Sequence, residues 1–322
     1  MEIVAVDIGG THARFAIADV ADGRVITLGE PVTLRTAEHA SLQAAWETYR
    51  AQAGRTLPRV AALAVACPVD GEVLKFTNNP WSLRPALIGE ALGLERHILI
   101  NDFAAVGHAI PSLGPEHLAH VCGPDRAFGP DEVISIVGPG TGLGVAQILR
   151  REGRNHIVAT EGGHIDFAPL DTLEDAILAR LRQLHRRVSV ERILSGQGLV
   201  AIHDVLAAIE GRAVLTQDVK ALWTLALAGS DSLAAAALDR FCLTLGSVAG
   251  DIALAQGGTA VVIAGGLGQR LSSHLPASGF ATRFAAKGRY EARMAGIPVR
   301  LVTHPQPGLF GAAAAFAQEF SR

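Results

Sequence analysis

The sequence has little of what membrane, secreted and nucleic-acid-coating proteins need. It contains three cysteines in 322 residues, and Cys67, Cys122 and Cys242 are widely spaced with no C-x-x-C pair. This spacing disfavours a structural zinc site and is typical of buried thiols in a reducing cytoplasm. There is no basic tail or long charge run, and the formal net charge is −3. The chain is therefore not expected to bind DNA or RNA non-specifically.

The N-terminus also lacks the basic region of a signal peptide. MEIVAVDIGG has an acidic residue at position 2 and is read as a first β-strand. Glycines interrupt the apolar runs, so we expect no segment of the ~18 residues needed to cross a bilayer. A composition of 49% hydrophobic and 18% charged residues is that of a soluble globular protein. The length predicts two domains.

Apolar, strand-like runs alternate with helix-like stretches along the chain, which predicts an α/β architecture with mixed sheets. Strands are predicted at 2–9, 13–20, 59–67, 97–102, 133–138, 144–149, 260–266 and 298–304. Helices are predicted at 41–50, 172–187, 199–211, 233–257 and 308–320.

Two distant segments share one pattern of strand, glycine turn, threonine and strand: VAVDIGGTHARFAIADV and ISIVGPGTGLGVAQILR. Placing Thr11 over Thr141 also aligns Gly10 with Gly140. One glycine-rich hairpin turn is common. Two matching turns this far apart indicate two related halves of the chain.

Backbone N–H groups of a glycine turn can converge on phosphate oxygens because no β-carbon blocks the approach. The stretch GPGTGLG at 138–144 lacks the lysine of a P-loop, and its glycines recur at every second residue. A strand follows it, where P-loop and dinucleotide sites require a helix. A P-loop ATPase and a nicotinamide enzyme are therefore disfavoured.

Two further features near glycines have open interpretations. Asp7 either holds Mg²⁺ beside a nucleotide phosphate, directly or through water, or hydrogen-bonds to its own turn. Gly265 and Gly266 follow a strand, where they either lie against a nucleotide or make a tight connection.

Polar side chains interrupt the apolar context at four places: TNNPW at 77–81, ND at 101–102, TEGGHIDF at 160–167 and SVERILSG at 189–196. They lack the clustered His and Cys ligands of a transition-metal site and suit a ligand with many hydroxyls, such as a sugar. Each also has a structural explanation. Asp102 can cap a helix, Glu191 can complement a helix dipole, and His164 can be a core histidine.

Specific motifs follow one another from the first strand to the last helix: DIGGTHARFA, CPVDGEVLKFTNNPW, INDFAAV, GPGTGLGVA, EGGHIDFAP, VSVERILSGQGLV, AGGLG and HPQPGLFGAA. Together they resemble the bacterial glucokinase family, within the actin-like and hexokinase-like ATPase superfamily. The resemblance covers essentially the whole chain. INDF, GTGLG and EGGHxDF are specific in combination, whereas AGG or DxGGT alone identifies only the superfamily.

The resemblance implies ATP-dependent transfer of the γ-phosphoryl group to the 6-hydroxyl of glucose, with Mg²⁺ and a homodimer. It implies Asp102 as the general base. It assigns the glucose contacts to Asn101, Asp102, Glu161, His164, Glu191 and, by a looser match, Asn78. It assigns the nucleotide side to Asp7, Gly9, Gly10, Thr11, Gly138, Gly140, Thr141, Gly142, Gly265 and Gly266, with Asp7 also next to Mg²⁺, directly or through water.

The implied fold is the two-domain, ribonuclease H-like fold of actin-like ATPases, with mixed sheets and a ligand cleft between the domains. We expect a small α/β domain of residues 1–105 and 307–322 and a large one of residues 106–306. His12 departs from the family, since many members have Asn there. The zinc-binding cysteine motif of the wider repressor and sugar-kinase family is absent.

Other functions remain open alternatives. The chain could be a kinase for fructose, mannose or an N-acetylhexosamine, because stereochemistry at one carbon is not legible in a sequence. A non-kinase actin-like ATPase is a more distant alternative. A sugar-responsive repressor is not expected, because the first strand begins by residue 3. We expect a cytoplasmic protein with glucose and ATP as partners and no nucleic acid or membrane partner.

Overall fold

The computed structural model describes residues 1–76, 79–213 and 218–320. The chain forms two compact units: unit 1 is Met1–Gly114 with His304–Arg322, and unit 2 is Pro115–Thr303. We expected the domain boundaries at 105/106 and 306/307. The boundaries between the two units lie at 114/115 and 303/304. The first difference arises because α3 (Asp102–Ala109) packs on α11 (Pro307–Glu319), which keeps both helices in unit 1.

Unit 1 contains a six-stranded mixed sheet of order β3-β2-β1-β5-β8, with β4 also paired to β2. β1 pairs antiparallel with β2 and parallel with β5, which pairs parallel with β8. The strands are β1 (Glu2–Ile8), β2 (His12–Ala21), β3 (Arg24–Leu28), β4 (Val32–Arg35), β5 (Val60–Val65) and β8 (Arg96–Asn101). A hairpin of β6 (Leu74–Lys75) and β7 (Ser82–Leu83) and the helices α1 (Leu42–Ala53) and α2 (Ile88–Leu92) complete this unit with α3 and α11.

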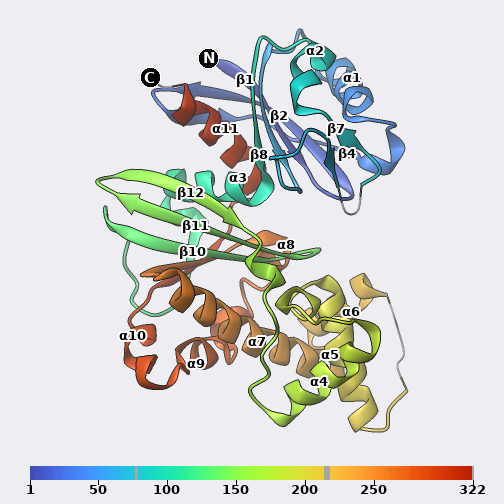
Figure 1. Cartoon of the computed structure of the whole chain (residues 1–322), viewed down its shortest axis with the longest axis vertical. Coiled ribbons are helices and arrows are strands. Elements are labelled where there is room, and N and C mark those ends of the chain that lie inside the picture. Colours follow the sequence, from blue (N-terminus) through green and yellow to red (C-terminus); the bar gives the residue numbers. More distant parts are fainter. Residues whose placement is uncertain (77–78, 214–217, 321–322) are drawn as a thin grey trace. The chain divides into compact units, whose positions relative to one another are not determined.

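The two faces of β1 pack on different helices of unit 1, with α1 on one side of the sheet and α11 on the other (Figure 1). Val4 and Val6 belong to the core cluster that includes α1. Ile3 and Ala5 belong to the cluster that includes α11. Because side chains alternate along a strand, Asp7 points to the α11 face, in line with Ile3 and Ala5.

Unit 2 contains a second six-stranded sheet, of order β12-β11-β10-β13-β14-β9. The first five strands in this order repeat the pattern of β3-β2-β1-β5-β8 in unit 1, with three antiparallel strands followed by two strands that pair in parallel. The expectation of two related halves is therefore confirmed. The strands are β9 (Leu118–Cys122), β10 (Glu132–Pro139), β11 (Leu143–Arg151), β12 (Arg154–Thr160), β13 (Ala260–Ile263) and β14 (Val299–Val302).

In unit 2, α7 (Ser232–Gln256) packs against α9 towards one end and against α5 and α6 towards the other (Figure 1). Of the remaining helices, α4 packs on α5, α10 packs on α9, and α8 packs on β10 and β14. The helices besides α7 are α4 (Thr172–Leu184), α5 (Gly196–Ile209), α6 (Val219–Ala228), α8 (Gly265–Arg270), α9 (Phe280–Ala285) and α10 (Glu291–Ala295). Contrary to our expectation, α7 is long and apolar enough to cross a membrane. However, 72% of its apolar window is buried inside the structure, as in the core helix of a packed domain.

Candidate functional site

The candidate residues of unit 1 lie at one edge of its sheet. In the parallel ladder Ile8 pairs with Val65, and Val65 pairs with Asn101. The carboxyl ends of β1, β5 and β8 therefore finish at the same level, which is where open α/β sheets bind ligands. The turn after β1, Cys67 after β5 and Asp102 after β8 all follow this edge.

The first glycine turn, Gly9 to Thr11, is fixed by hydrogen bonds. The N–H of Gly9 donates to the carbonyl of His12 at 2.9 Å. The hydroxyl of Thr36 donates to the carbonyl of Gly10 at 3.0 Å. Thr11 Oγ1 and His12 Nδ1 lie 2.9 Å apart and form a hydrogen bond. The turn thus keeps one shape, with Thr11 exposed.

Asn78 lies outside the described residues, but its neighbour Asn79 is described. Asn79 is 6% exposed, and its amide donates to the carbonyl of Gly9 at 3.2 Å while its side-chain oxygen accepts from the N–H of Trp81 at 2.9 Å. Asn79 therefore ties the TNNPW segment to the first glycine turn. We did not predict this contact, although the motif contained both asparagines.

Asp7 is enclosed by two residues that the sequence did not single out. Arg14, its antiparallel partner on β2, donates to Oδ2 of Asp7 at 3.3 Å. On the α11 face, a β-carbon added to Gly308 would meet Oδ2 at 2.7 Å. Burial raises the pKa of the Asp7 carboxyl, and Arg14 partly offsets this rise. The side chain is still 18% exposed.

Asn101 and Asp102 divide two tasks at the start of α3. Asn101 is the N-cap, since its side-chain oxygen accepts from the N–H groups of Phe103 and Ala104 at 2.8 and 3.1 Å. Its amide donates to the carbonyl of Cys67 at 3.4 Å. The capping role considered for Asp102 therefore belongs to Asn101.

Asp102 lies one residue further, in the first turn of α3. Its Oδ1 accepts from the N–H of Phe103 at 2.9 Å. Its charge also acts on the thiol of Cys67, whose pKa is raised to about 11, by burial first and by Asp102 second. Asp102 is thus a carboxylate on a rigid helix start, oriented through Asn101.

The second glycine turn, in unit 2, closes between β10 and β11. The N–H of Gly140 donates to the carbonyl of Gly142 at 2.8 Å, and the N–H of Gly196 at the start of α5 donates to the carbonyl of Gly140 at 2.9 Å. Gly265, with φ 79°, lies so close that a β-carbon there would meet the carbonyl of Pro139 at 2.6 Å. Gly138 to Gly142 and Gly265 are therefore brought together, with Gly266 next in the chain.

The sugar-side candidates of unit 2 lie around the same turn. Glu161 Oε2 and His164 Nε2 are 3.6 Å apart, and both side chains are more than half exposed. His164 is therefore not the core histidine that we considered. Gly163, which lies between these two residues in the chain, packs directly on the residue after the turn. A β-carbon on Gly163 would meet the carbonyl oxygen of Leu143 at 2.0 Å. Glu191 accepts from the N–H of Leu143 at 2.9 Å.

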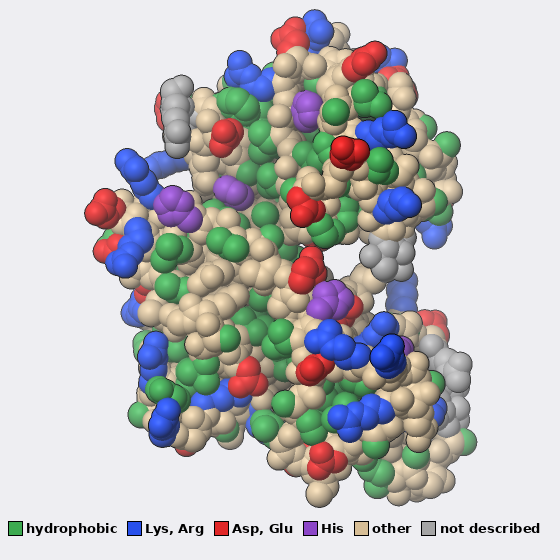
Figure 2. Space-filling view, in the orientation of Figure 1, with side chains coloured by type: hydrophobic (Ala, Val, Ile, Leu, Met, Phe, Trp, Pro, Cys, Tyr) green, Lys and Arg blue, Asp and Glu red, His purple; other side chains and the backbone are tan. Residues whose placement is uncertain are grey.

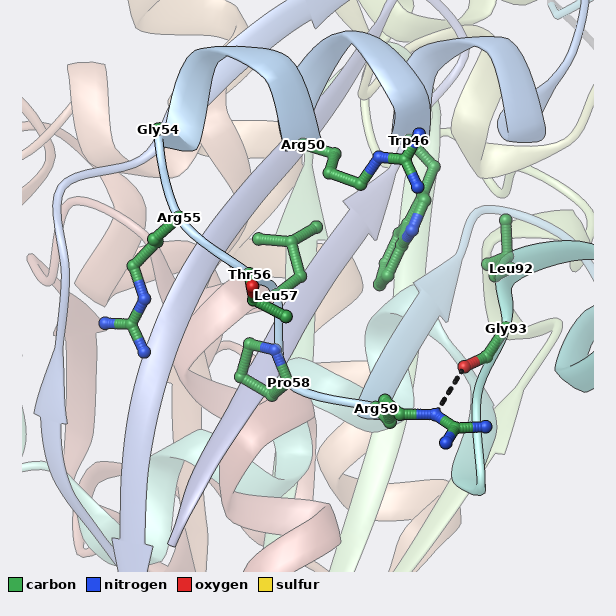
Figure 3. Close-up of a pocket in the computed structure, with 10 residues that line it drawn as sticks. All are labelled: Trp46, Arg50, Gly54, Arg55, Thr56, Leu57, Pro58, Arg59, Leu92 and Gly93. Atoms are coloured by element: carbon green, nitrogen blue, oxygen red, sulfur yellow. Dashed lines mark hydrogen bonds between the residues drawn. The ribbon is translucent and has the colours of Figure 1, made fainter.

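A cavity of about 540 Å³ in unit 1 contains none of the candidate residues (Figure 3). Its wall combines Trp46 and Leu57 with Arg50, Arg55 and Arg59. Each arginine already pairs with a glutamate: Arg50 with Glu47, Arg55 with Glu2, and Arg59 with Glu95 at 2.8 Å. The candidate residues are thus defined by the sheet edges and not by this cavity.

No group of three or more His, Cys, Asp or Glu side chains that could hold a metal ion occurs within residues 1–76, 79–213 and 218–320. Mg²⁺ at a nucleotide needs no such group, because it is usually held by one or two carboxylates together with substrate phosphates. Asp7 is the candidate carboxylate.

Comparisons with known proteins agree with the resemblance in the sequence. The family model described as Glucokinase matches residues 4–319. A glucokinase of Zymomonas mobilis is 63% identical over 322 residues, which cover all of this chain and 99% of the relative. The crystal structure of a glucokinase from an Antarctic psychrotroph has a TM-score of 0.82 at 34% identity and covers 98% of both chains.

A more distant structure shares the fold. A ROK family glucokinase from Streptomyces griseus, solved with glucose and AMPPNP, has a TM-score of 0.64 at 19% identity, covering 98% of this chain and 99% of that one.

Proposed function

Because this chain belongs to the glucokinase family, we propose that it transfers the γ-phosphoryl group of ATP to the 6-hydroxyl of D-glucose. The products are glucose 6-phosphate and ADP. The observation that carries the proposal is the position of Asp102, a carboxylate at the carboxyl edge of a parallel sheet, held on a helix start by Asn101. Phosphoryl transfer depends mainly on alignment and charge neutralisation. In a kinase, a positioned carboxylate orients the attacking hydroxyl and accepts its proton.

In this mechanism Asp102 accepts the proton of the 6-hydroxyl. The hydroxyl oxygen forms a bond to the γ-phosphorus, and the bond from that phosphorus to the bridging oxygen breaks, leaving ADP. Asn101, Glu161, His164 and Glu191 hold the other hydroxyls of the sugar, with Asn78 as a further candidate outside the described residues. Exclusion of water from the bound sugar would favour transfer to the 6-hydroxyl over hydrolysis of ATP.

The nucleotide side of the proposal rests on the two glycine turns. The turn of Gly9, Gly10 and Thr11 and the turn of Gly138, Gly140, Thr141 and Gly142 surround the phosphates. They offer phosphate oxygens backbone N–H groups other than those of Gly9 and Gly140, which close the turns. Gly265 and Gly266 support the nucleotide beside the second turn. Asp7 would hold Mg²⁺, directly or through water, and the ion would supply neutralisation of charge on the phosphates.

We also propose a homodimer in the cytoplasm. The three cysteines are free, and burial raises their pKa values to about 11 for Cys67 and Cys122 and about 12 for Cys242. Such thiols are poorly reactive, which fits a reducing compartment. On the face in Figure 2, Lys and Arg side chains are interspersed with Asp and Glu, which does not favour a nucleic-acid partner. Light scattering of the purified chain tests the dimer.

The experiment that tests the function is a coupled ADP-release assay over a panel of sugars. Glucose, fructose, mannose, galactose and N-acetylglucosamine are each supplied with ATP, and polyphosphate replaces ATP in a second series. The proposal expects ADP release that depends on glucose and on ATP. A stronger response to another hexose would assign a different sugar kinase, and release without any sugar would favour a non-kinase ATPase.

A further inference from the structure

Glu191 stands on a firmly anchored segment of unit 2. It lies in a short helical turn, Val190–Arg192. Val190 on one side of it and Ile193 and Leu194 on the other are at most 2% exposed. The N–H of Val190 also donates to the carbonyl of Ile165 at 2.9 Å. The backbone beneath Glu191 is thus fixed by burial and by a hydrogen bond, so its side chain starts from a defined point.

The carboxylate of Glu191 reaches the second glycine turn. Oε2 accepts from the N–H of Leu143 at 2.9 Å. It also occupies the place where Gly142 lacks a side chain, since a β-carbon there would lie 2.3 Å from Oε2 and 3.0 Å from Cδ. Any other residue at position 142 would therefore displace this carboxylate. Gly142 leaves space for Glu191 as much as for a ligand.

This contact acts on the turn that is proposed to bind phosphate. Gly142 is the last residue of the turn and Leu143 is the first residue of β11. The carbonyl of Gly142 accepts the closing hydrogen bond from Gly140. A hydrogen bond to an ionised acceptor is roughly twice as strong as a neutral one. The ionised side chain of Glu191 thus holds the closing residues before any ligand is bound.

We infer that Glu191 is a positioning residue for the nucleotide, in addition to the sugar contact implied by the resemblance. Its carboxylate fixes the turn at residues 140–143 in the conformation that presents N–H groups to phosphate. A carboxylate has about four lone-pair sites, so one group accepts from Leu143 and from a sugar hydroxyl together. The roles in sugar and nucleotide binding rest on the proposed function, whereas the hold of Glu191 on the turn rests on the contacts alone.

The test is the affinity of the full chain for AMPPNP with Mg²⁺ in the absence of glucose, measured by calorimetry. Glu191→Ala removes the acceptor, and we expect the affinity to fall about tenfold, as for the loss of a hydrogen bond to a charged group. Glu191→Gln keeps an acceptor oxygen for Leu143 but loses the charge, so we expect its affinity to lie between those of Glu191→Ala and the parent. A residue that contacts only the sugar would leave AMPPNP binding unchanged in both variants, and that result would overturn the inference.

Asp166 provides the matched control. It is a carboxylate near the same segment, 74% exposed, with Oδ1 accepting from Nε of Arg187 at 2.6 Å. Asp166→Asn removes the same charge without touching the turn, and AMPPNP affinity should stay within about twofold of the parent. An equal loss in Asp166→Asn and Glu191→Ala would assign the effect to net charge and overturn the inference.

Hydrogen exchange gives a second readout that needs neither nucleotide nor sugar. Amides of the 138–146 peptide should exchange faster in Glu191→Ala than in the parent and in Asp166→Asn. Unchanged exchange would overturn the inference even if nucleotide affinity fell. A parent chain that bound no AMPPNP would count against the proposed function instead, and exchange would still decide whether Glu191 holds the turn.

Discussion

The carboxylate of Asp7 lies directly against the α-carbon of Gly308, at the first turn of α11. A β-carbon on Gly308 would come within 2.7 Å of Oδ2 and 2.8 Å of Cγ. Asp7 and Gly308, far apart in the sequence, are thus in direct contact. The carboxylate of Asp7 occupies the space that a side chain at position 308 would need.

Gly308→Ala should therefore displace the Asp7 carboxylate while leaving the fold intact, because the clash is with the end of a side chain. We expect an Mg²⁺ requirement several-fold above that of the parent, and a melting temperature close to the parent's. Initial rates over an Mg²⁺ titration and a thermal melt measure the two effects. An unchanged Mg²⁺ dependence would separate Asp7 from the metal.

Gly311→Ala, one turn further along α11, should behave differently. The added β-carbon would meet the carbonyl oxygen of Ala105 at 1.8 Å, and this neighbour is backbone of α3. Since α3 and α11 cannot both keep their places, we expect a loss of about 3 kcal/mol in the free energy of unfolding. Urea unfolding of this variant beside Gly308→Ala tests the contrast, and equal stabilities would contradict it.

Asp102→Asn should lower kcat by about 10²- to 10⁴-fold, the usual contribution of a positioned base. The KM for glucose should change much less, because the amide keeps the shape and an acceptor oxygen. Asp19→Asn is the control. Asp19 lies on β2 opposite Glu2 in the ladder, at the end of β1 away from the candidate residues. Near-parental turnover in a folded Asp102→Asn protein would remove Asp102 from the role of base.

Asp171 should contribute stability that is lost in acid. Burial raises its pKa, but hydrogen bonds from the backbone of Glu174 and from Arg240 and Arg283 outweigh this and hold the pKa at about 2. Its ordinary value is 3.8, so the carboxylate stabilises the fold fully above that pH and loses this effect as the pH falls through about 2.

We expect Asp171→Asn to lower the free energy of unfolding at pH 7 by about 1–2 kcal/mol, after allowance for a side chain that is one-third exposed. The difference from the parent should shrink towards pH 2. Asp175→Asn, an exposed carboxylate in the first turn of the same helix, should have little effect. A difference that persists unchanged in acid would contradict the assigned pKa.

The main strands and helices could be predicted from local patterns, because each depends on the periodicity of its own residues. All eight predicted strands and five predicted helices occur within a few residues of the expected ranges. The strands β3, β4, β6, β7, β9 and β12 were not predicted, and of these β3 and β12 had a local signal as well. Asp22-Gly23 and Glu152-Gly153 have positive φ angles, and such pairs mark tight hairpin turns.

The family, the repeated hairpin and the types of chemical group at the site were determined by the sequence itself, since motifs and spacing are written along the chain. Only the tertiary structure decided which groups meet. It made Asn101 rather than Asp102 the helix cap, brought Gly308 and Arg14 to Asp7, and placed Glu191 on the turn beside Gly142. The contacts of Asp7 with Gly308 and of Leu143 with Glu191 join residues far apart in the chain. The space left by a missing β-carbon has a use only when another segment fills it.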